Sequence, residues 1–570
     1  MLLDWLADPS TERGLRLRGA GGEWQFHSYR ELAADVHRVS ATLRSAGAER
    51  GSVVSLVLAD PWTFIASFMG TIAAGMVPSP LATPLAFRKA DRYIAHLASV
   101  FGVAQPAVVL TDAVLGEQVA AGVERSGIGG TVRRLDLSQP ADPAEAAFEA
   151  PAAPVGPDEL ALLQFTSGST GTPKGVRVTW SALNANVQAI RDWLGWSDQD
   201  TFASWLPLYH DMGLIGGMIT PIASGTDLWL MTPDQFIRSP LAWLECFGKH
   251  GVTLTTAPSF GYAYTARRVK PAEIEDFDFS AWRVAILGAE RIEPAAISDF
   301  YSLVGPRHFD AGALIGAYGL AEVTLAATGV RPGAGSRLVR TKSTALSIGE
   351  DVLVAETARL GTDAVGGAGW MTGCGTALDG LAVAVVDDQG QPLPDGAFGE
   401  IRLTGSSLAH GYLMTGGELA PFGSDGLYTG DSGFLLDGEL FVVGRIGESM
   451  KVRGANVHAE DLEVELAELP GLAKVRCAVA FGFLDAAHYA VVFVEEDVTP
   501  QWLTAATERV RTLTAGAAEP IVLRGKRGAI ARTSSGKPRR RVMWTELVTE
   551  PATEWTVLHG EPPAGLHTAG

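Results

Sequence analysis

The stretch of this sequence that is best suited to chemistry lies between Gln164 and Val176 and reads QFTSGSTGTPKGV. It concentrates glycine and hydroxyl residues around one lysine, Lys174, and follows an apolar run, 160–165, that is typical of a buried strand. Backbone N–H groups and hydroxyls of such a loop can converge on a phosphate, and the lysine adds positive charge. Lys174 is followed by Gly175, so the G-K-[ST] ending of a Walker A loop is absent. Taken alone, a run of this composition is more often a flexible loop, so the other motifs must decide.

Two further segments contain side chains that can meet a small ligand. In SWLPLYHDMGLIGG, residues 204–217, His210 stands beside an aromatic residue and an aspartate and before several glycines. This pattern suits a wall where a side chain meets a ligand, although a buried core histidine is the commoner explanation. TTAPSFGYAY, residues 255–264, reads as a strand that turns into a core helix.

Small residues and carboxylates recur further along the chain. In ILGAERI, residues 286–292, and GAYGLAEVTL, residues 316–325, small side chains allow the close approach of a flat ring, on which Tyr318 can stack. Glu322 offers the carboxylate that a hard divalent cation prefers, unless it is only a solvent-exposed glutamate. In LYTGDSGFLLDGELFVVGRIG, which starts at Leu427, Asp431 lies where a turn between two strands can present its carboxylate, or where it only forms the turn.

Charge is distributed unevenly along the chain. The formal net charge is −19, which disfavours nonspecific binding to nucleic acid. Residues 524–541 nevertheless carry eight Lys or Arg and no acid. A solvated basic tail is the simplest explanation, but the contrast with the rest of the chain favours a functional patch that serves ATP or an acidic partner.

The pattern of elements predicts how these segments are positioned. Apolar strands alternate with amphipathic helices down to about residue 330, which predicts α/β layers with parallel sheets. The helical pattern of residues 23–48 contains Ser28 and Glu31 at the spacing of a capping box and stops at Gly47. Residues 331–372 read as an insertion of short strands and loops, and residues 382–445 as a small β-rich subdomain.

The predicted fold class is therefore α/β. We expect a large N-terminal domain of layered α/β subdomains plus the small β-rich subdomain over residues 1–446, and a small mobile α+β C-terminal domain over residues 447–548. Leucines at helical spacing predict a helix over 460–469 in that second domain. The tail, 549–570, has little to bury and is expected to be disordered.

Composition sets the compartment and the class of protein. With 570 residues, 47% of them hydrophobic and 19% charged, the chain is typical of a soluble globular protein with several subdomains. No apolar run reaches the length of a membrane span, and the start of the chain lacks the features of a signal peptide. Three scattered cysteines, Cys246, Cys374 and Cys477, have neither zinc-site spacing nor a disulfide framework. We therefore expect a cytoplasmic protein.

Taken together and in this order, the motifs resemble the adenylate-forming superfamily of acyl-CoA synthetases, luciferases and nonribosomal adenylation domains. The resemblance covers roughly residues 15–545. The wording HDMGLIGG and the motif around Cys374 are most similar to fatty acyl-AMP ligases. So is the long segment of roughly fifty residues between Glu322 and GCGTALDG at 373–380. In those ligases the insertion is thought to restrict the C-terminal domain and to disfavour CoA. The resemblance implies ATP and Mg²⁺ as cofactors.

The resemblance also implies roles for individual residues. Phosphate contacts would come from Thr166, Ser167, Gly168, Ser169, Thr170, Gly171 and Lys174, and the nucleotide wall from Gly288, Ala289, Glu290, Ala317, Tyr318, Gly319 and Leu320. Asp431 and Arg445 would hold the ribose, Glu322 and Thr170 would hold Mg²⁺, and Lys537, His210 and Glu322 would be catalytic. The acyl pocket would include Tyr209, Met212, Gly213, Ser259 and Phe260, with Ser259 where these ligases usually have Asn. Gly447 falls at the hinge, where Asp or Lys is common.

The implied reaction joins a carboxylate oxygen to the α-phosphorus of ATP and releases pyrophosphate. Catalysis would then depend on positioning and electrostatics. The acyl group would pass to the phosphopantetheine thiol of a separate acyl carrier protein, in lipid or natural-product biosynthesis, and the basic segment 524–541 could contact that acidic partner. Three alternatives stay open. These are an acyl- or aryl-CoA ligase, a ligase that transfers the acyl group to a small-molecule hydroxyl or amine, and an inactive binding protein. The last would be expected to lack Lys537, Glu322 or Asp431.

Overall fold

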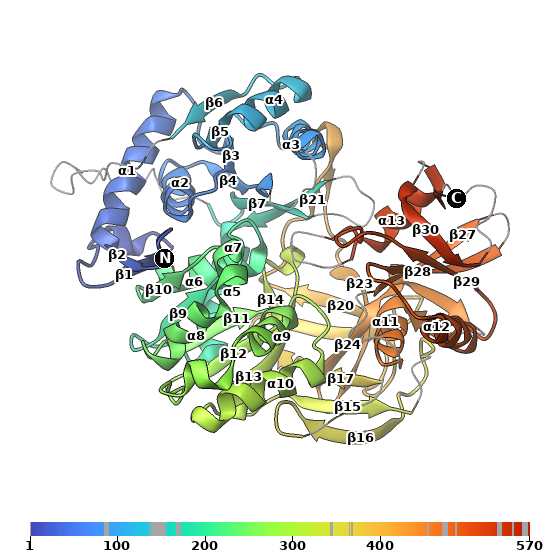
Figure 1. Ribbon diagram of the computed structural model, residues 1–570. Helices are drawn as coiled ribbons and strands as arrows, with labels where there is room; N and C mark the ends of the chain where they lie inside the picture. Colours follow the sequence, from blue (N-terminus) through green and yellow to red (C-terminus); the bar gives the residue numbers. More distant parts are fainter. Residues whose placement is uncertain are drawn as a thin grey trace.

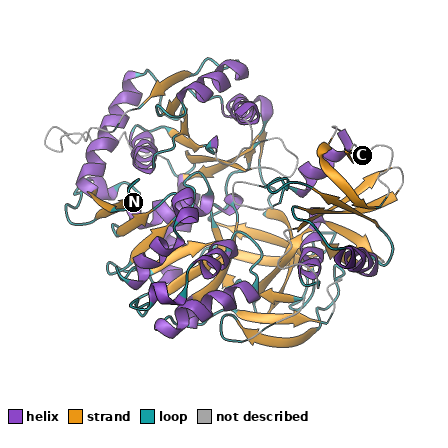
Figure 2. Cartoon of the chain, in the orientation of Figure 1, coloured by secondary structure: helices purple, strands orange, loops and turns teal. Residues whose placement is uncertain are grey.

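The computed structural model describes residues 2–84, 90–135, 137, 156–166, 173–342, 346–363, 365, 369–452, 455–469, 477–484, 487–532, 538–549, 552–560 and 568–569. Layers of helix and sheet build the larger part of the chain, and a smaller group of elements follows at its C-terminal end (Figure 1). Figure 2 shows that the helices gather around the N-terminal two thirds of the chain, whereas strands dominate the rest. This agrees with the predicted α/β class.

The central sheet has nine strands in the order β18-β14-β13-β12-β11-β9-β10-β1-β2. The strands are β1 (Gly14–Arg18), β2 (Trp24–Ser28), β9 (Thr201–Ser204), β10 (Asp227–Leu230), β11 (Leu254–Ala257), β12 (Val284–Leu287), β13 (Leu314–Gly319), β14 (Ala326–Gly329) and β18 (Thr376–Ala377). The six strands from β13 to β1 in this order run parallel. Every residue of β11 and β12 is buried, as expected for a parallel sheet with both faces covered.

Helices pack on this sheet and complete its core (Figure 1). They are α5 (Trp180–Leu194), α6 (Thr220–Ala223), α7 (Pro233–Arg238), α8 (Pro240–Gly248), α9 (Ser259–Arg268) and α10 (Pro294–Val304), with a π-helix at Met212–Ile219. The core on one side is rich in aromatic rings, such as Trp282, which stacks on Phe247 with ring centroids 3.8 Å apart. The predicted strand-to-helix turn at residues 255–264 is confirmed by β11 and α9.

A second parallel sheet lies near the N-terminal end, in the blue part of Figure 1, in the order β4-β3-β5-β6. Its elements are β3 (Val53–Val57), β4 (Val77–Pro80), β5 (Val108–Thr111), β6 (Thr131–Arg134), α1 (Tyr29–Ser45), α2 (Pro61–Ala73), α3 (Ala90–Ala104) and α4 (Gly116–Ser126). The capping box of Ser28 and Glu31 is present at the start of α1. The helix predicted from residue 23 is wrong before that cap, because residues 24–28 form β2 and pair with β1. The partner strand overrides the local helical pattern.

Three antiparallel sheets follow along the chain. One has the order β22-β21-β8-β7 and contains β7 (Leu160–Thr166), β8 (Lys174–Thr179), β21 (Tyr412–Leu413) and β22 (Leu419–Ala420). The segment predicted as an insertion supplies the second, with β15 (Arg337–Thr341), β16 (Val354–Arg359) and β17 (Trp370–Thr372). The third contains β19 (Leu381–Val386), β20 (Gly399–Gly405), β23 (Leu427–Leu436) and β24 (Glu439–Arg445).

We call the described residues from Ser449 onward the C-terminal unit. It contains β25 (Ser449–Val452), β26 (Ala455–His458), α11 (Ala459–Ala467), β27 (Cys477–Leu484), β28 (Ala487–Val494), α12 (Pro500–Leu513), β29 (Glu519–Arg524), α13 (Arg540–Thr549), β30 (Ala552–His559) and β31 (Thr568–Ala569). The strands from β27 to β31 form one sheet, and the apolar clusters on its two faces are drawn from this unit itself. A separate core of this kind is what the predicted small domain requires.

The end of the chain differs from the prediction of a tail with little to bury. β30 pairs antiparallel with β29, and Trp555 is buried against Phe493 with ring centroids 4.9 Å apart. One large aromatic side chain therefore fixes a segment whose composition resembles a disordered tail. No helix among the described residues is long and apolar enough to cross a lipid bilayer.

Candidate active site

The strands on either side of the glycine-rich loop form a hairpin. β7 and β8 pair antiparallel, with Thr166 opposite Lys174, so the loop between them starts and ends at one place. The predicted phosphate-binding residues Ser167, Gly168, Ser169, Thr170 and Gly171 lie outside the described residues. The ammonium group of Lys174 lies 5.2 Å from the ring centroid of Tyr412, within the range of a cation–π interaction. Lys174 is thereby placed next to a residue that the sequence analysis did not single out.

Tyr412 connects this hairpin to the predicted metal ligand. It lies on β21 opposite Val176 of β8, and its hydroxyl donates a hydrogen bond of 2.8 Å to Oε1 of Glu322. Burial raises the pKa of Glu322, the bond from Tyr412 opposes that shift, and the carboxylate of Asp211 adds to it. The carboxylate of Glu322 is therefore held beside the hairpin by Tyr412 and lies within electrostatic range of Asp211.

The groups around Glu322 suit Mg²⁺ that is bound together with a nucleotide. Among the described residues no group of three or more His, Cys, Asp or Glu could hold a metal ion by itself. Mg²⁺ bound with a nucleotide does not need such a cage, because phosphate oxygens and waters supply most of its ligands and protein carboxylates supply one or two. The half-buried Glu322 and the carboxylate of Asp211, which interacts with it electrostatically, fit that requirement, and their negative charge suits a cation.

The predicted ribose-binding pair is formed across two strands. Asp431 on β23 lies opposite Arg445 on β24, and Nε of Arg445 donates to Oδ1 of Asp431 over 3.0 Å. The other oxygen, Oδ2, accepts a 2.7 Å bond from the hydroxyl of Tyr318. Asp431 is thus held inside a strand and not in a turn, which corrects the sequence-based expectation. A strand position, with both oxygens bonded, fixes the direction of the carboxylate more firmly than a turn does.

Two chain segments at one edge of the central sheet form the predicted nucleotide wall. β12 and β13 are parallel neighbours, with Leu287 opposite Gly316, so Gly288–Glu290 follow the end of β12 beside Ala317–Gly319, which continue β13 and pair with β14. A side chain at Gly288 would come within 3.3 Å of the carbonyl of Ala317. The absence of that side chain keeps the two segments close and leaves a flat backbone surface between them.

Two of the predicted acyl-side residues, Tyr209 and His210, lie on the loop that leads into the π-helix, which itself contains Met212 and Gly213. The ring of His210 lies 5.0 Å from the ring of Tyr209, and the carbonyl of Tyr209 accepts a 2.8 Å bond from Nε2 of Gln164. Burial raises the pKa of Tyr209 to about 12. At Gly213 a Cβ would lie 2.3 Å from the carbonyl of Pro207, so this turn requires glycine. The π-helix that follows is a local distortion of a kind that often occurs at functional sites.

Comparison with known proteins identifies the family of this chain. Residues 12–413 match the family described as AMP-binding enzyme. The chain belongs to the AMP-binding enzyme family. It is therefore an adenylate-forming enzyme.

Individual relatives agree with the family. A protein of Caulobacter vibrioides with the provisional name acyl-CoA synthetase is 33% identical over 81% of this chain and 79% of its own length. A medium-chain-fatty-acid–[acyl-carrier-protein] ligase of Moorena producens is 28% identical over 93% of this chain and 91% of its own. A solved structure from a study of fatty acyl-adenylate ligases of E. coli and L. pneumophila matches with a TM-score of 0.83 and 28% identity, covering 96% of both chains.

The AMP-binding enzyme carries an aromatic wall next to its predicted acyl-side residues, which sequence reasoning noted only in part. Trp205 stacks on Phe236 at 4.1 Å, and Phe260 meets Trp205 edge-on at 6.2 Å and Tyr264 at 5.7 Å. Ser259, at the start of α9, is buried beside this wall. Two signals were available in the sequence, since Trp205 precedes the histidine motif and Phe260 and Tyr264 lie four residues apart on one helix face.

The basic segment of the AMP-binding enzyme is only partly exposed. Arg540 is buried and pairs with Glu448, with Glu460 at 3.1 Å and with Glu463 at 2.8 Å. This corrects the expectation that the whole cluster faces a partner. Lys526, Arg527 and Arg541 are exposed. Lys537, the predicted catalytic lysine, lies outside the described residues, and the predicted hinge Gly447 has open space where a Cβ would be.

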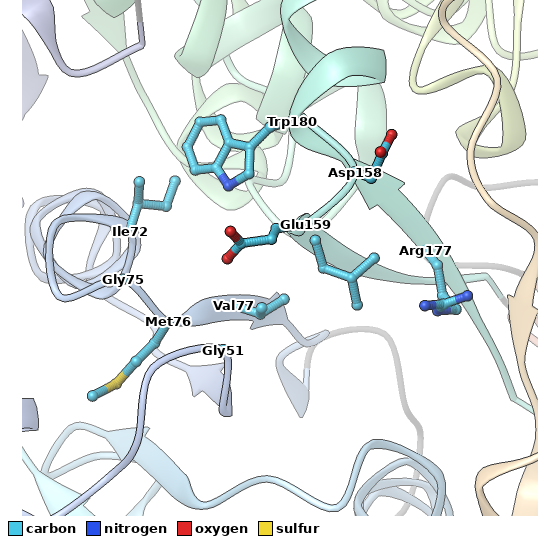
Figure 3. A pocket seen from close by; sticks show the side chains of 10 residues that line it. Gly51, Ile72, Gly75, Met76, Val77, Asp158, Glu159, Arg177 and Trp180 are labelled. Carbon is cyan, nitrogen blue, oxygen red and sulfur yellow. The ribbon is translucent and has the colours of Figure 1, made fainter. Parts of the chain in front are cut away.

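A pocket of about 240 Å³ lies elsewhere in the AMP-binding enzyme, between β4 with the end of α2 and the start of the β7–β8 hairpin (Figure 3). Val77, Glu159 and Trp180 line it, and none of the predicted site residues does. Its position separates it from the nucleotide wall, and we do not assign it to the active site.

Proposed function

We propose that this AMP-binding enzyme activates an apolar carboxylic acid with ATP and Mg²⁺ and passes the acyl group to the phosphopantetheine thiol of a separate carrier protein. The observation that carries the proposal is the connected array in which Tyr412 touches both Lys174 and Glu322 while Tyr318 and Arg445 hold Asp431. These contacts support a common site for phosphate, metal and ribose, to which residues on or next to strands of three sheets contribute.

In the first step a carboxylate oxygen attacks the α-phosphorus of ATP, the new P–O bond forms, and the bond to pyrophosphate breaks. Lys174 stabilises the leaving pyrophosphate, and Asp431 with Arg445 orients the ribose. Mg²⁺, when bound, neutralises charge on the phosphates. Lys537 is assigned to the attacking and bridging oxygens on the strength of its motif. The remaining contribution is alignment of two anions in a partly dry site, which is an electrostatic and entropic effect.

The acid is proposed from the aromatic wall around Trp205 and Phe260, which favours an apolar chain or ring over a charged one. The Moorena relative is named for medium-chain fatty acids and for a carrier protein, so these acids are the first to test. Aryl and hydroxy acids complete the panel, because Ser259 adds a polar atom to the wall.

ATP–pyrophosphate exchange across that panel tests the first step. We expect one class of acid to support exchange, and we expect Lys537→Ala to lower it by at least about a hundredfold, since removal of one group that stabilises transition-state charge has that size of effect. Near wild-type exchange in the variant would reject the assignment of Lys537. If none of the acids in the panel supported exchange, the proposed adenylation would be rejected.

A CoA ligase of the same fold is the second candidate, favoured by the provisional name of the Caulobacter relative. Incubation of acyl-AMP with CoA or with a phosphopantetheinylated carrier separates the two. Thioester formation with the carrier and not with CoA supports our proposal, and the reverse result supports the CoA ligase.

A further inference from the structure

One buried ion pair joins the nucleotide wall to the C-terminal unit. Arg291 follows Glu290 directly, and its Nη1 lies 2.5 Å from Oδ1 of Asp461 on α11. The side chains are 18% and 5% exposed, respectively. Residues on the surface that pair at similar distances, such as Arg238 and Asp234, are 69% and 49% exposed. The Arg291–Asp461 pair is therefore shielded from solvent in a way that ordinary surface pairs are not.

Arg291 also contacts the segment 331–372, which was predicted as an insertion. Its Nη2 donates to the carbonyl of Trp370, on β17, over 3.4 Å. One guanidinium group thus contacts the insertion and the C-terminal unit while its backbone continues the nucleotide wall. The planar fork of arginine can serve two acceptors in fixed directions, which lysine cannot do.

The surroundings of Asp461 make it dependent on this arginine. Oδ2 of Asp461 has no hydrogen-bond partner among the described residues and is buried. The neighbouring His458 is fully buried, and burial lowers its pKa, so at neutral pH it adds no positive charge. Removal of Arg291 would leave a buried carboxylate without its main counter-charge, and that state is strongly unfavourable.

Other contacts between the two parts involve residues that lie close to Asp461 in the chain. Oγ of Ser432 lies 3.4 Å from Nε2 of His458, and the backbone N–H of Asn456 donates to the carbonyl of Leu346 over 2.8 Å. On the other side of the C-terminal unit Arg92 of α3 pairs with Glu546 of α13 at 3.3 Å, but these side chains are 58% and 29% exposed. Figure 1 shows α11 close to β23 and β24, at the side of the C-terminal unit that faces the rest of the chain.

We propose that Arg291 and Asp461 are a positioning pair that holds the C-terminal unit against the nucleotide wall and favours acyl-AMP formation over the later transfer step. This inference rests on the proposed two-step function. The pair touches no reacting atom. It acts by tying the arrangement of the C-terminal unit to the segment Gly288–Glu290, so that the pair must break before the unit can move away from the nucleotide.

The test uses the full chain with Arg291→Gln, Asp461→Asn and the charge reversal Arg291→Asp with Asp461→Arg. Arg238→Gln, which removes an exposed pair, is the matched control. Three quantities are measured for each protein. They are ATP–pyrophosphate exchange, the rate of acyl transfer from added acyl-AMP to a thiol acceptor, and the distance distribution between spin labels on the two parts.

The labels are placed at Asp276→Cys and Glu496→Cys, which are exposed positions on the two parts. Of the native cysteines, Cys246 and Cys374 are buried, and burial raises the pKa of the half-buried Cys477, so the introduced thiols react first. The distance measurement needs no ligand and no turnover. It therefore tests the pair even if the proposed reaction fails.

We expect each single variant to lower exchange about tenfold, to leave transfer unchanged or faster, and to broaden the distance distribution. The charge reversal should restore exchange and distances to within about threefold of the parent protein. The proposal would be overturned if the single variants lowered exchange and transfer equally and left the spin-label distances unchanged. It would also be overturned if the charge reversal did not restore exchange. Should Arg291→Gln fail to fold, the nearly isosteric Asp461→Asn decides by the same criteria. Absence of exchange in the parent protein would reject the proposed function alone.

Discussion

The hydroxyl of Tyr412 donates a 2.8 Å hydrogen bond to the carboxylate of Glu322, ninety residues earlier in the chain. The same ring lies 5.2 Å from the ammonium group of Lys174. One tyrosine therefore joins the lysine of the phosphate hairpin to the carboxylate assigned to the metal. Its ring and its hydroxyl serve different neighbours, so substitutions can separate the two contributions.

Tyr412→Phe removes the hydroxyl and keeps the ring. We expect exchange to fall about three- to tenfold and the Mg²⁺ concentration for half-maximal rate to rise, because Glu322 loses a hydrogen bond that orients it. The exchange rate of Tyr412→Leu should be lower still, because the cation–π contact with Lys174 is also lost. Exchange rates across a Mg²⁺ titration measure both effects. Identical rates in the phenylalanine variant and the parent would show that the hydroxyl has no part in catalysis.

Glu322→Gln should abolish exchange yet stabilise the folded protein at pH 7 to 8. Burial raises the folded-state pKa of Glu322 above its unfolded value, so the ionised carboxylate destabilises the native state above that pKa. This destabilisation disappears as the pH falls through the folded pKa toward the ordinary glutamate range. Melting temperatures should therefore be higher in the variant at neutral pH and converge with the parent on acidification.

The control for this measurement is Glu159→Gln, which changes an exposed carboxylate whose pKa is lowered by the backbone N–H of Gly156. The melting temperature of that variant should not exceed that of the parent protein at neutral pH. A lower melting temperature in Glu322→Gln at pH 8 would contradict the assigned direction.

Asp431→Asn should raise the KM for ATP by about ten- to a hundredfold and leave the KM for the acid unchanged. The amide keeps the shape but loses the charge that attracts Arg445, and a charged hydrogen bond of this kind contributes about 1.5–3 kcal/mol. Initial rates with each substrate varied in turn give the two constants. Asp425→Asn, at an exposed position of a neighbouring loop, is the matched control. Parallel increases in both constants would indicate general damage to the fold.

Lys526→Glu together with Arg527→Glu should slow loading of an acidic carrier about tenfold at low salt and leave pyrophosphate exchange unchanged. Both side chains are exposed, whereas Arg540 in the same basic segment is neutralised internally by three glutamates. The loss should shrink at high ionic strength, where surface charges are screened. Lys249→Glu together with Lys270→Glu, at two exposed positions outside the C-terminal unit, is the charge-matched control. Loading that is indifferent to both variants would place the carrier on another surface.

Much of the local structure could be predicted because it depends on neighbours in sequence. The capping box of Ser28 and Glu31, the strand before the glycine-rich loop and the helix over 459–467 each follow from residues within one or two turns. The order of the motifs likewise identified the enzyme family, since each motif is a short segment whose chemistry is written in adjacent residues.

The tertiary structure decided what depends on distant partners. Residues 24–28 became a strand because β1 offered an edge, and Trp555 became buried because Phe493 offered a surface. The place of Tyr412 in the site depends on its contacts with Glu322 and Lys174. Arg540 is not part of the exposed basic surface because it pairs with three glutamates. Contacts of this kind depend on which elements pack together, and no local pattern of residue types encodes that choice. The sequence by itself determined the chemistry available to this protein, whereas packing decided which side chains act together.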